Sequence, residues 1–221
     1  AFGTGGFTQA TGPGANVTEY LVLINPYNFL QNRARGLDIE ASYQFRLEDI
    51  AADLPGSISL RAIATRYLEA SESNGVDKPT DSVGENTGSG PPKWIYRATL
   101  SYNLDNFAMQ VIGRGLSSGV YNNNWVDCAS NCPATDVINR TIADNRIAGA
   151  FYLDTYLAYT LPVRGSESQL FFRVSNLLNK DPAKVGKGPA DNSNVDTGIN
   201  QTLYDFLGRT FRVGVRFNLG G

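Results

Sequence analysis

The chain has 221 residues with 19 basic and 21 acidic side chains, a formal net charge of −2, no histidine and two cysteines. This balance of charge argues against nucleic acid as a partner, and the lack of histidine excludes histidine-dependent catalytic triads and histidine metal sites. Two cysteines are too few for a zinc site, so we expect neither a metal nor a cofactor. No segment approaches the roughly 18 consecutive apolar residues of a membrane-spanning helix.

Alternation of apolar and polar residues predicts seven β-strands, because successive side chains of a strand point to opposite faces. In chain order the expected strands are residues 36–46, 57–68, 93–103, 107–116, 151–161, 169–178 and 209–218. Strands of about 9–11 residues with this period are what a transmembrane β-barrel requires, with apolar residues facing lipid and polar ones facing the lumen. The sequence therefore predicts an all-β fold, an antiparallel transmembrane β-barrel segment of seven or eight strands.

The connections between these strands alternate in length. Long polar connections, 69–92, 117–149 and 179–201, follow the second, fourth and sixth strands, and short turns, 47–56, 103–106 and 162–168, follow the other three. Outer-membrane barrels have long extracellular loops and short periplasmic turns, whereas a soluble sandwich lacks this strict alternation. We therefore expect long loops outside, a periplasmic C-terminus, and residues 1–35 as an extracellular loop or partial strand.

The odd number of strands leaves two interpretations, since single-chain bacterial barrels have an even number. Residues 19–24 could add a short eighth strand, which would give an independent eight-stranded barrel with a structural or surface-binding role. Alternatively, the chain is part of a larger barrel.

Three motifs, in the same order along the chain, resemble those of TonB-dependent outer-membrane receptors of the sphingomonad-like type. Residues 25–28 (Asn-Pro-Tyr-Asn) and 36–40 (Gly-Leu-Asp-Ile-Glu) resemble an asparagine followed by a strand of that family. Residues 171–180 resemble the penultimate-strand motif, which ends in "NLLNK". Tyr204-Asp205, Gly208-Arg209 and residues 211–217 resemble the final strand. The resemblance extends from about residue 25 to residue 217.

The resemblance implies that residues 1–221 are the C-terminal part of a 22-stranded plugged barrel. The plug domain, the TonB box and the N-terminal strands are then expected to lie outside this sequence. It implies an active transport receptor rather than an enzyme, which binds a siderophore, carbohydrate or other nutrient outside the cell and imports it with energy supplied by TonB. The expected partners are outer-membrane lipid, the rest of the receptor, the TonB complex through the missing part, and the nutrient. An outer-membrane lipase or protease is the weakest alternative, because histidine is absent.

Charged residues on the polar sides of the strands are expected to face the lumen. Seven are basic and three acidic: Asp38, Glu40, Arg61, Lys93, Arg97, Arg114, Asp154, Arg173, Arg212 and Arg216. One interpretation is an electropositive wall that favours anionic substrates, with Arg97 and Arg114 as ligand contacts. The other, which we favour, is that these charges pair with one another and with a plug.

The long loops offer further candidates. Asn123, Asn124 and Trp125 combine amides with an indole, which suits sugars or aromatic ligands, although an ordinary exposed turn with an aromatic anchor explains them better. Cys128 and Cys132 predict a small loop-closing disulfide of an oxidising compartment. The loop acids Asp77, Asp81, Glu85, Asp191 and Asp196 lack EF-hand spacing, so we expect solvated side chains rather than a calcium site. Aromatic residues on the apolar sides are expected at the lipid face and its girdles: Tyr43, Phe45, Trp94, Tyr96, Tyr102, Tyr159 and Phe217.

Overall fold

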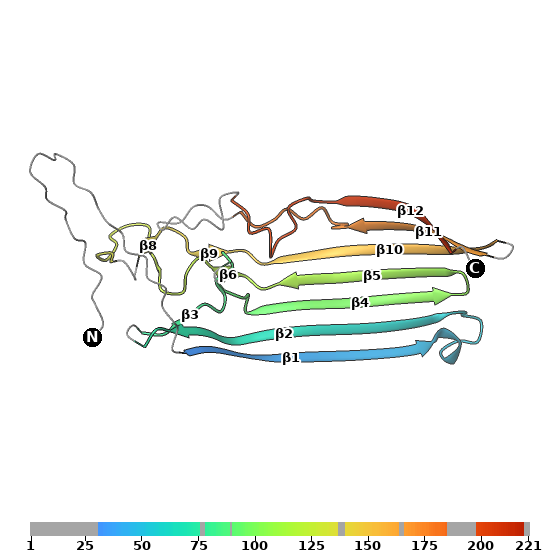
Figure 1. The fold of residues 1–221 in the computed structure, drawn as a ribbon, viewed down its shortest axis with the longest axis horizontal. Coiled ribbons are helices and arrows are strands. Elements are labelled where there is room, and N and C mark those ends of the chain that lie inside the picture. Colours follow the sequence, from blue (N-terminus) through green and yellow to red (C-terminus); the bar gives the residue numbers. More distant parts are fainter. Residues whose placement is uncertain are drawn as a thin grey trace, which may run out of the picture.

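The computed structural model describes residues 31–75, 78–88, 90–136, 140–163, 166–184 and 198–218. Its main element is one antiparallel sheet in which each long strand pairs with the next one along the chain (Figure 1). The strands, in spatial order, are β1 (Gln31–Arg46), β2 (Ser57–Ser73), β4 (Trp94–Leu104), β5 (Phe107–Leu116), β10 (Ala150–Val163), β11 (Ser166–Ser175) and β12 (Thr210–Asn218). The short β3 (Thr80–Asp81) pairs with the end of β2. The prediction of an all-β antiparallel fold of seven or eight strands is confirmed.

The sheet is not closed across the part of the chain that the structure describes, and β1 and β12 form its two edges. Long connections follow β2, β5 and β11 and lie at one end, whereas the short turns lie at the other (Figure 1). The turn after β1 contains a short 3-10 helix (Leu47–Asp49). Among the described residues no helix is long and apolar enough to cross a membrane.

Several predicted strand boundaries were wrong. β1 begins five residues before the predicted start and β2 ends five residues after its predicted end, because the polar residues 31–35 pair with residues 69–73. A β-bulge at Arg35/Gly36 separates this extension from the rest of the pair. β11 ends at Ser175 rather than 178, since Asn176 and Asn179 have left-handed φ angles of 53° and 50° that a strand cannot accommodate.

The hairpin between β10 and β11 is also tighter than predicted. Val163 pairs with Ser166, so most of the expected turn 162–168 belongs to the two strands. The possible strand at residues 19–24 and the first 30 residues of the expected segment 1–35 lie outside the described residues.

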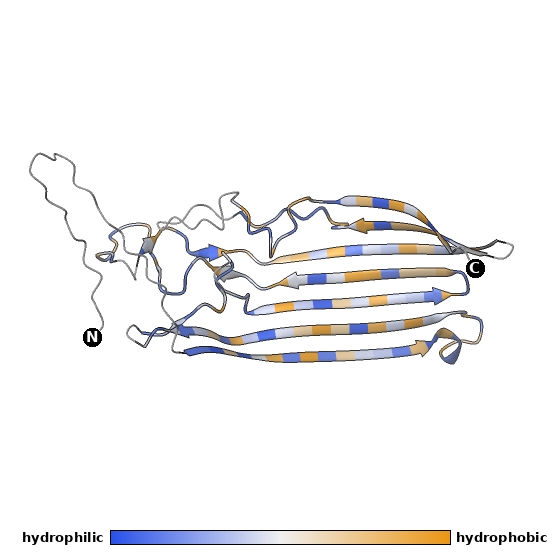
Figure 2. Ribbon diagram, viewed as in Figure 1, coloured by the Kyte–Doolittle hydropathy of each residue, from blue (hydrophilic) through white to orange (hydrophobic). Residues whose placement is uncertain are grey.

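The register places the predicted apolar residues of all seven strands on a single face of the sheet, since directly paired residues point the same way. This apolar face comprises odd residues 37–45 of β1, even residues 58–66 of β2, even residues 94–104 of β4, odd residues 107–115 of β5, odd residues 151–161 of β10, even residues 170–174 of β11 and odd residues 211–217 of β12. Only Arg66 and Thr155 in this set are neither apolar nor aromatic. Figure 2 shows the resulting alternation along the strands.

The opposite face, the polar face, carries the charged residues predicted to lie together. All ten except Lys93, which immediately precedes β4, belong to strands and share this face. The two faces therefore differ in chemistry over the whole width of the sheet.

Tight packing is concentrated at the end of the sheet where the long connections meet. The described residues of 78–93, 117–149 and 198–208, here called the loop cluster, include two small ladders. One joins β6 (Gly119–Val120) to β9 (Arg146–Ile147), and the other joins β7 (Val126–Asp127) to β8 (Thr141–Ile142). Beneath them lies a buried hydrophobic group made of Leu116, Ile147, Ala150, Tyr152 and Tyr204.

Candidate functional site

The two arginines predicted as ligand contacts, Arg97 and Arg114, are direct cross-strand partners on β4 and β5. Both lie on the polar face, so the structure does bring them together. Two like charges in directly opposed positions are destabilising unless other groups compensate for them. Their surroundings show how the two residues differ.

Arg114 is held by two carboxylates. Its Nε donates to Asp154 Oδ2 at 2.8 Å and its Nη2 donates to Asp205 Oδ2 at 3.0 Å. The guanidinium carbon lies 4.7 Å from the centre of the Tyr152 ring. Asp154 is only 4% exposed and also accepts the backbone N–H of Asn176 at 2.8 Å. Arg114 therefore joins β5 and β10 to the loop cluster, as the pairing interpretation of the charged residues predicts.

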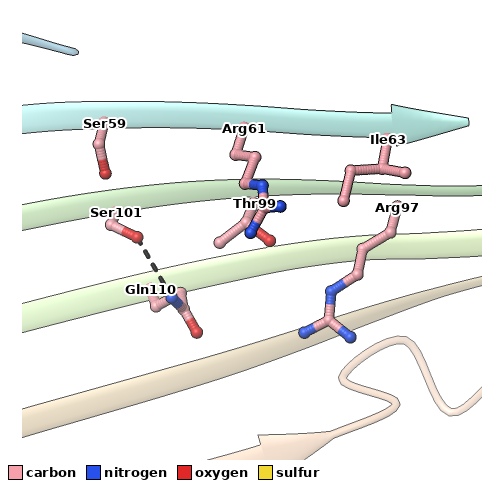
Figure 3. A pocket seen from close by; sticks show the side chains of 7 residues that line it. All are labelled: Ser59, Arg61, Ile63, Arg97, Thr99, Ser101 and Gln110. Atoms are coloured by element: carbon pink, nitrogen blue, oxygen red, sulfur yellow. Dashed lines mark hydrogen bonds between the residues drawn. The ribbon is translucent and has the colours of Figure 1, made fainter. Parts of the chain in front are cut away.

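Arg97 faces a polar basin of about 390 Å³ on the same face (Figure 3). Within the described part of the chain its guanidinium has no ion-pair or hydrogen-bond partner, whereas the nearby Arg61 donates from Nε to Glu40 Oε1 at 2.8 Å. Gln110 donates to the Ser101 hydroxyl at 3.2 Å on the floor of the basin. The lining residues are Ser59, Arg61, Ile63, Arg97, Thr99, Ser101 and Gln110. The basin thus combines cationic groups with neutral hydrogen-bonding groups, a combination that suits a polar or anionic molecule.

The loop candidate Asn123 connects two loops. Its side-chain Nδ2 donates to the backbone oxygens of Asp81 and Val83 at 2.8 and 3.1 Å. Its backbone N–H donates to Glu85 Oε1 at 2.8 Å. Burial raises the pKa of Glu85 above the ordinary value of 4.5, although this hydrogen bond acts in the opposite direction. The donor groups of Asn123 are therefore already used within the protein.

The neighbouring candidates form an ordered turn. The backbone N–H of Asn124 donates to the side-chain oxygen of Asn122 at 2.8 Å. Trp125 stacks on Tyr121, with ring centres 5.9 Å apart. Asn145 supports this turn from below, because its Nδ2 donates to the backbone oxygens of Asn122 and Trp125 at 2.9 and 3.3 Å. These contacts fit the interpretation of a turn with an aromatic anchor.

Buried polar side chains in the loop cluster were not anticipated from the sequence. Asn200 donates to the backbone oxygen of Asn86 at 2.9 Å, and Asn86 donates from Nδ2 to the Tyr204 hydroxyl at 3.2 Å. Tyr204 in turn donates to the backbone oxygen of Ala148 at 2.7 Å, and burial raises its pKa. Irregular loops carry no periodic signal that would identify such residues. The Tyr204-Asp205 dipeptide in the family-like motif was the one available indication.

A second cavity, of about 660 Å³, lies where β2 and β4 meet the loop cluster. Its lining residues are Arg66, Tyr67, Leu68, Lys78, Pro79, Asp81, Val83, Lys93, Trp94, Ser117, Ser118, Asn123 and Asn124. Three of these residues are basic and one is acidic, so the cavity has an excess of positive charge. These residues come from four separate segments, and no sequence pattern groups them.

Cys128 and Cys132 form a disulfide, with Cα atoms 5.5 Å apart, as predicted. It closes a small loop next to β7, where the backbone N–H of Cys128 donates to Ile142 O at 2.8 Å. No group of three or more potential metal ligands occurs within the described residues. Of the loop acids expected to be solvated, Asp81 is exposed, but Glu85 is only 5% exposed, so the expectation was wrong for Glu85, which accepts the backbone N–H of Asn123. Asp77, Asp191 and Asp196 lie outside the described residues.

The polar face and the loop cluster present hydrogen-bonding groups and positive charge, and these groups are suited to binding a polar or anionic molecule. Comparison of the chain with protein-family models, with curated proteins and with solved structures finds no significant match in any of the three.

Proposed function

We propose that this chain is the C-terminal part of a 22-stranded, plugged outer-membrane barrel of the TonB-dependent receptor type. In this role it takes part in the active import of a small-molecule nutrient that binds from outside the cell. The long loops are extracellular and the C-terminus is periplasmic. The observation that carries the proposal is the apolar face, which continues across seven strands and opposes a charged face.

The exposure of the apolar face supports a lipid environment. Leu100 of β4, Tyr159 of β10 and Val213 of β12 are 41%, 46% and 72% exposed, so the exposure extends from the inner strands to the edge. A sheet in water would cover such a continuous apolar surface with a second layer, because large exposed apolar patches are unfavourable. The polar face cannot serve as the core of a water-soluble sandwich, since it carries arginines and carboxylates.

The dimensions of the apolar face also fit a membrane. On β4 the apolar face extends from Trp94 to Leu104, ten residues apart. At about 3.4 Å per residue this separation is roughly 34 Å along the strand, which a strand tilt of about 35–45° reduces to roughly 24–28 Å across the membrane, close to the apolar band of about 25 Å in outer-membrane barrels. Tyr43 and Phe45 lie at the same end as Tyr102, with ring centres 5.7 Å apart, and form part of one aromatic girdle.

The two open edges favour a larger barrel over an independent eight-stranded one. β1 is a 16-residue strand, and an unpaired edge of this length would be a template for aggregation. A six-residue strand at residues 19–24 could pair with fewer than half of those residues. In the proposed receptor, strands from the missing part pair with β1 and β12 and remove both edges.

The polar face supplies a candidate ligand wall in this proposal. Arg97 and the basin around it are available for a polar or anionic substrate, whereas Arg114 maintains the structure. The loop residues Asn123, Asn124 and Trp125 shape the outer mouth, and any contact with ligand from Asn123 would be through its exposed surface.

The orientation can be tested with two matched variants of the complete protein in intact cells. Asn124→Cys lies in an exposed loop and Asn106→Cys lies in the exposed short turn at the opposite end of the sheet. A membrane-impermeant maleimide should label the first in intact cells and the second only after the outer membrane is opened. Equal labelling of both without permeabilisation would overturn the proposed orientation.

Transport itself is tested by uptake of a panel of labelled siderophores and carbohydrates. We expect at least one ligand whose uptake requires both this protein and the TonB complex. Uptake that persists without the TonB complex would contradict the receptor proposal. If the chain by itself instead forms a monomer whose gel mobility changes on heating, the eight-stranded alternative is the correct one.

A further inference from the structure

The basic cavity at the end of β2 and β4 is not used by the transport function proposed above. Three of its lining residues, Arg66, Lys78 and Lys93, carry positive charge and are exposed. Within the described residues none of them has an ion-pair partner. The one carboxylate in the lining, Asp81, uses its Oδ1 to accept the backbone N–H groups of Ala70 and Val83 at 3.0 and 3.1 Å.

Arg66 has an unusual position, because it is the one charged residue of the apolar face. Its direct cross-strand neighbours are Leu37 on β1 and Trp94 on β4. The guanidinium carbon lies 5.3 Å from the centre of the Trp94 ring. This cation–π contact orients the guanidinium over the ring, and because Arg66 is exposed and has no ion-pair partner within the described residues, its charge is open to an anion from outside.

This position coincides with the outer limit of the apolar band. Toward the short turns, the apolar face of β2 continues with Ala64, Ala62, Leu60 and Ile58. In the other direction Leu68 is followed by a stretch in which polar residues predominate, namely Glu69, Ser71, Glu72 and Ser73. Tryptophan and long basic side chains are favoured at this level of a membrane, where the aromatic ring contacts acyl chains and the cation reaches the headgroups. Arg66 and Trp94 therefore stand where a lipid phosphate would lie.

We propose that the cavity binds the phosphate of an anionic lipid in the outer leaflet, whose acyl chains lie along the apolar face beside Trp94. The planar guanidinium of Arg66 suits two phosphate oxygens at once, and the ammonium groups of Lys78 and Lys93 add charge around the same anion. This inference rests on the membrane placement of the apolar face in the proposed function.

Quenching of tryptophan fluorescence by brominated lipids provides the test. Residues 1–221 contain two tryptophans, so Trp125→Phe leaves Trp94 as the one indole of this part and preserves an aromatic ring on Tyr121. The difference in quenching between this variant and the double variant Trp94→Phe/Trp125→Phe isolates the signal of Trp94. The folded protein is titrated with dibrominated phosphatidic acid or dibrominated phosphatidylcholine in neutral micelles. We expect phosphatidic acid to quench Trp94 at a lower concentration. Each of Arg66→Gln, Lys78→Gln and Lys93→Gln should reduce this preference about fivefold for the charge removed.

The control is Arg212→Gln, which removes a cation from the exposed end of the polar face and should leave the preference unchanged. Equal quenching by both lipids would overturn the phosphate site and leave the membrane placement intact. Quenching by neither lipid would overturn the membrane placement and the inference with it. Loss of the preference in millimolar inorganic phosphate would show a site for free phosphate rather than for lipid, and would also overturn the proposal. Circular dichroism of each variant confirms that the strands are retained.

Discussion

Two ion pairs of equal length on the polar face allow the effect of burial on a charge to be measured directly. Arg114 Nε lies 2.8 Å from Asp154 Oδ2, and Arg61 Nε lies 2.8 Å from Glu40 Oε1. The side chain of Asp154 is 6% exposed, whereas that of Glu40 is 54% exposed. Removing one member of a buried pair costs about 3–5 kcal/mol, and an exposed pair contributes about 0–1 kcal/mol.

Asp154→Asn should therefore lower the free energy of unfolding by about 3 kcal/mol, near the lower limit of the buried range. Arg114 keeps its second carboxylate, Asp205, at 3.0 Å, so its charge is not left alone. Glu40→Gln should lower the free energy of unfolding by less than about 1 kcal/mol.

Urea titration of the folded protein in micelles, followed by tryptophan fluorescence, measures both losses. The dependence on urea should have the same slope in each variant, so that midpoints report stability. Asp205→Asn should give an intermediate loss and provides the measurement if Asp154→Asn does not fold. Losses for Asp154→Asn and Glu40→Gln that agree within about 0.5 kcal/mol would refute the reasoning from burial.

Three further predictions concern the loop cluster and the apolar face. Burial raises the pKa of Glu85, so the folded protein binds more protons than the unfolded one just above pH 4.5, and its stability falls as the pH rises through that window. Glu85→Gln should remove this part of the pH dependence of the urea midpoint, and an unchanged profile would contradict the assignment. A Cβ at Gly115 would lie 2.6 Å from a backbone oxygen, whereas one at Gly113 would meet only an aromatic ring at 3.1 Å. Gly115→Ala should therefore cost about 1–3 kcal/mol in thermal unfolding and Gly113→Ala less, and the reverse order would be inconsistent with the packing. Replacing Cys128 and Cys132 by serine should lower the stability of the folded loop by about 2 kcal/mol. Proteolysis within residues 117–149 should then be faster, whereas the rate of cleavage in the strands, which serves as the control, should not change.

The strands could be predicted from sequence because the two faces of the sheet differ in polarity, so apolar and polar residues alternate along each strand. This alternation fails where both sides of a strand are polar, as in residues 31–35 of β1, whose strand conformation depends on pairing with β2. The alternation also fails to predict Asn176, because its left-handed φ angle and its 0% exposure result from contacts with other parts of the fold rather than from the residues next to it in sequence. Its side-chain oxygen accepts the backbone N–H of Lys180 at 2.8 Å, which turns the chain out of β11.

The loop cluster was less predictable for a different reason. Its buried Asn86 and Asn200 lie 114 residues apart in sequence, and each satisfies polar groups that no local pattern connects. A polar, aperiodic segment is usually an exposed loop. Burial of such a segment is possible here because asparagine side chains supply the hydrogen bonds that its backbone would otherwise lack.

In the candidate site, a single pair of residues has one feature that the sequence predicts and one that only the fold determines. Periodicity assigns Arg97 and Arg114 to one face with equal weight, and the structure confirms that they are opposed. What separates their surroundings is a pair of carboxylates around Arg114. Asp154 on the neighbouring strand lies 2.8 Å from its Nε, and Asp205, 91 residues beyond Arg114, reaches its Nη2 because the last long connection folds back over the sheet. Arg97 has no such partner within the described residues and remains directed at the basin. It follows that a change in Asp205 alone would leave Arg114 paired with Asp154, so that Arg97 stays the one unpaired cation of the two.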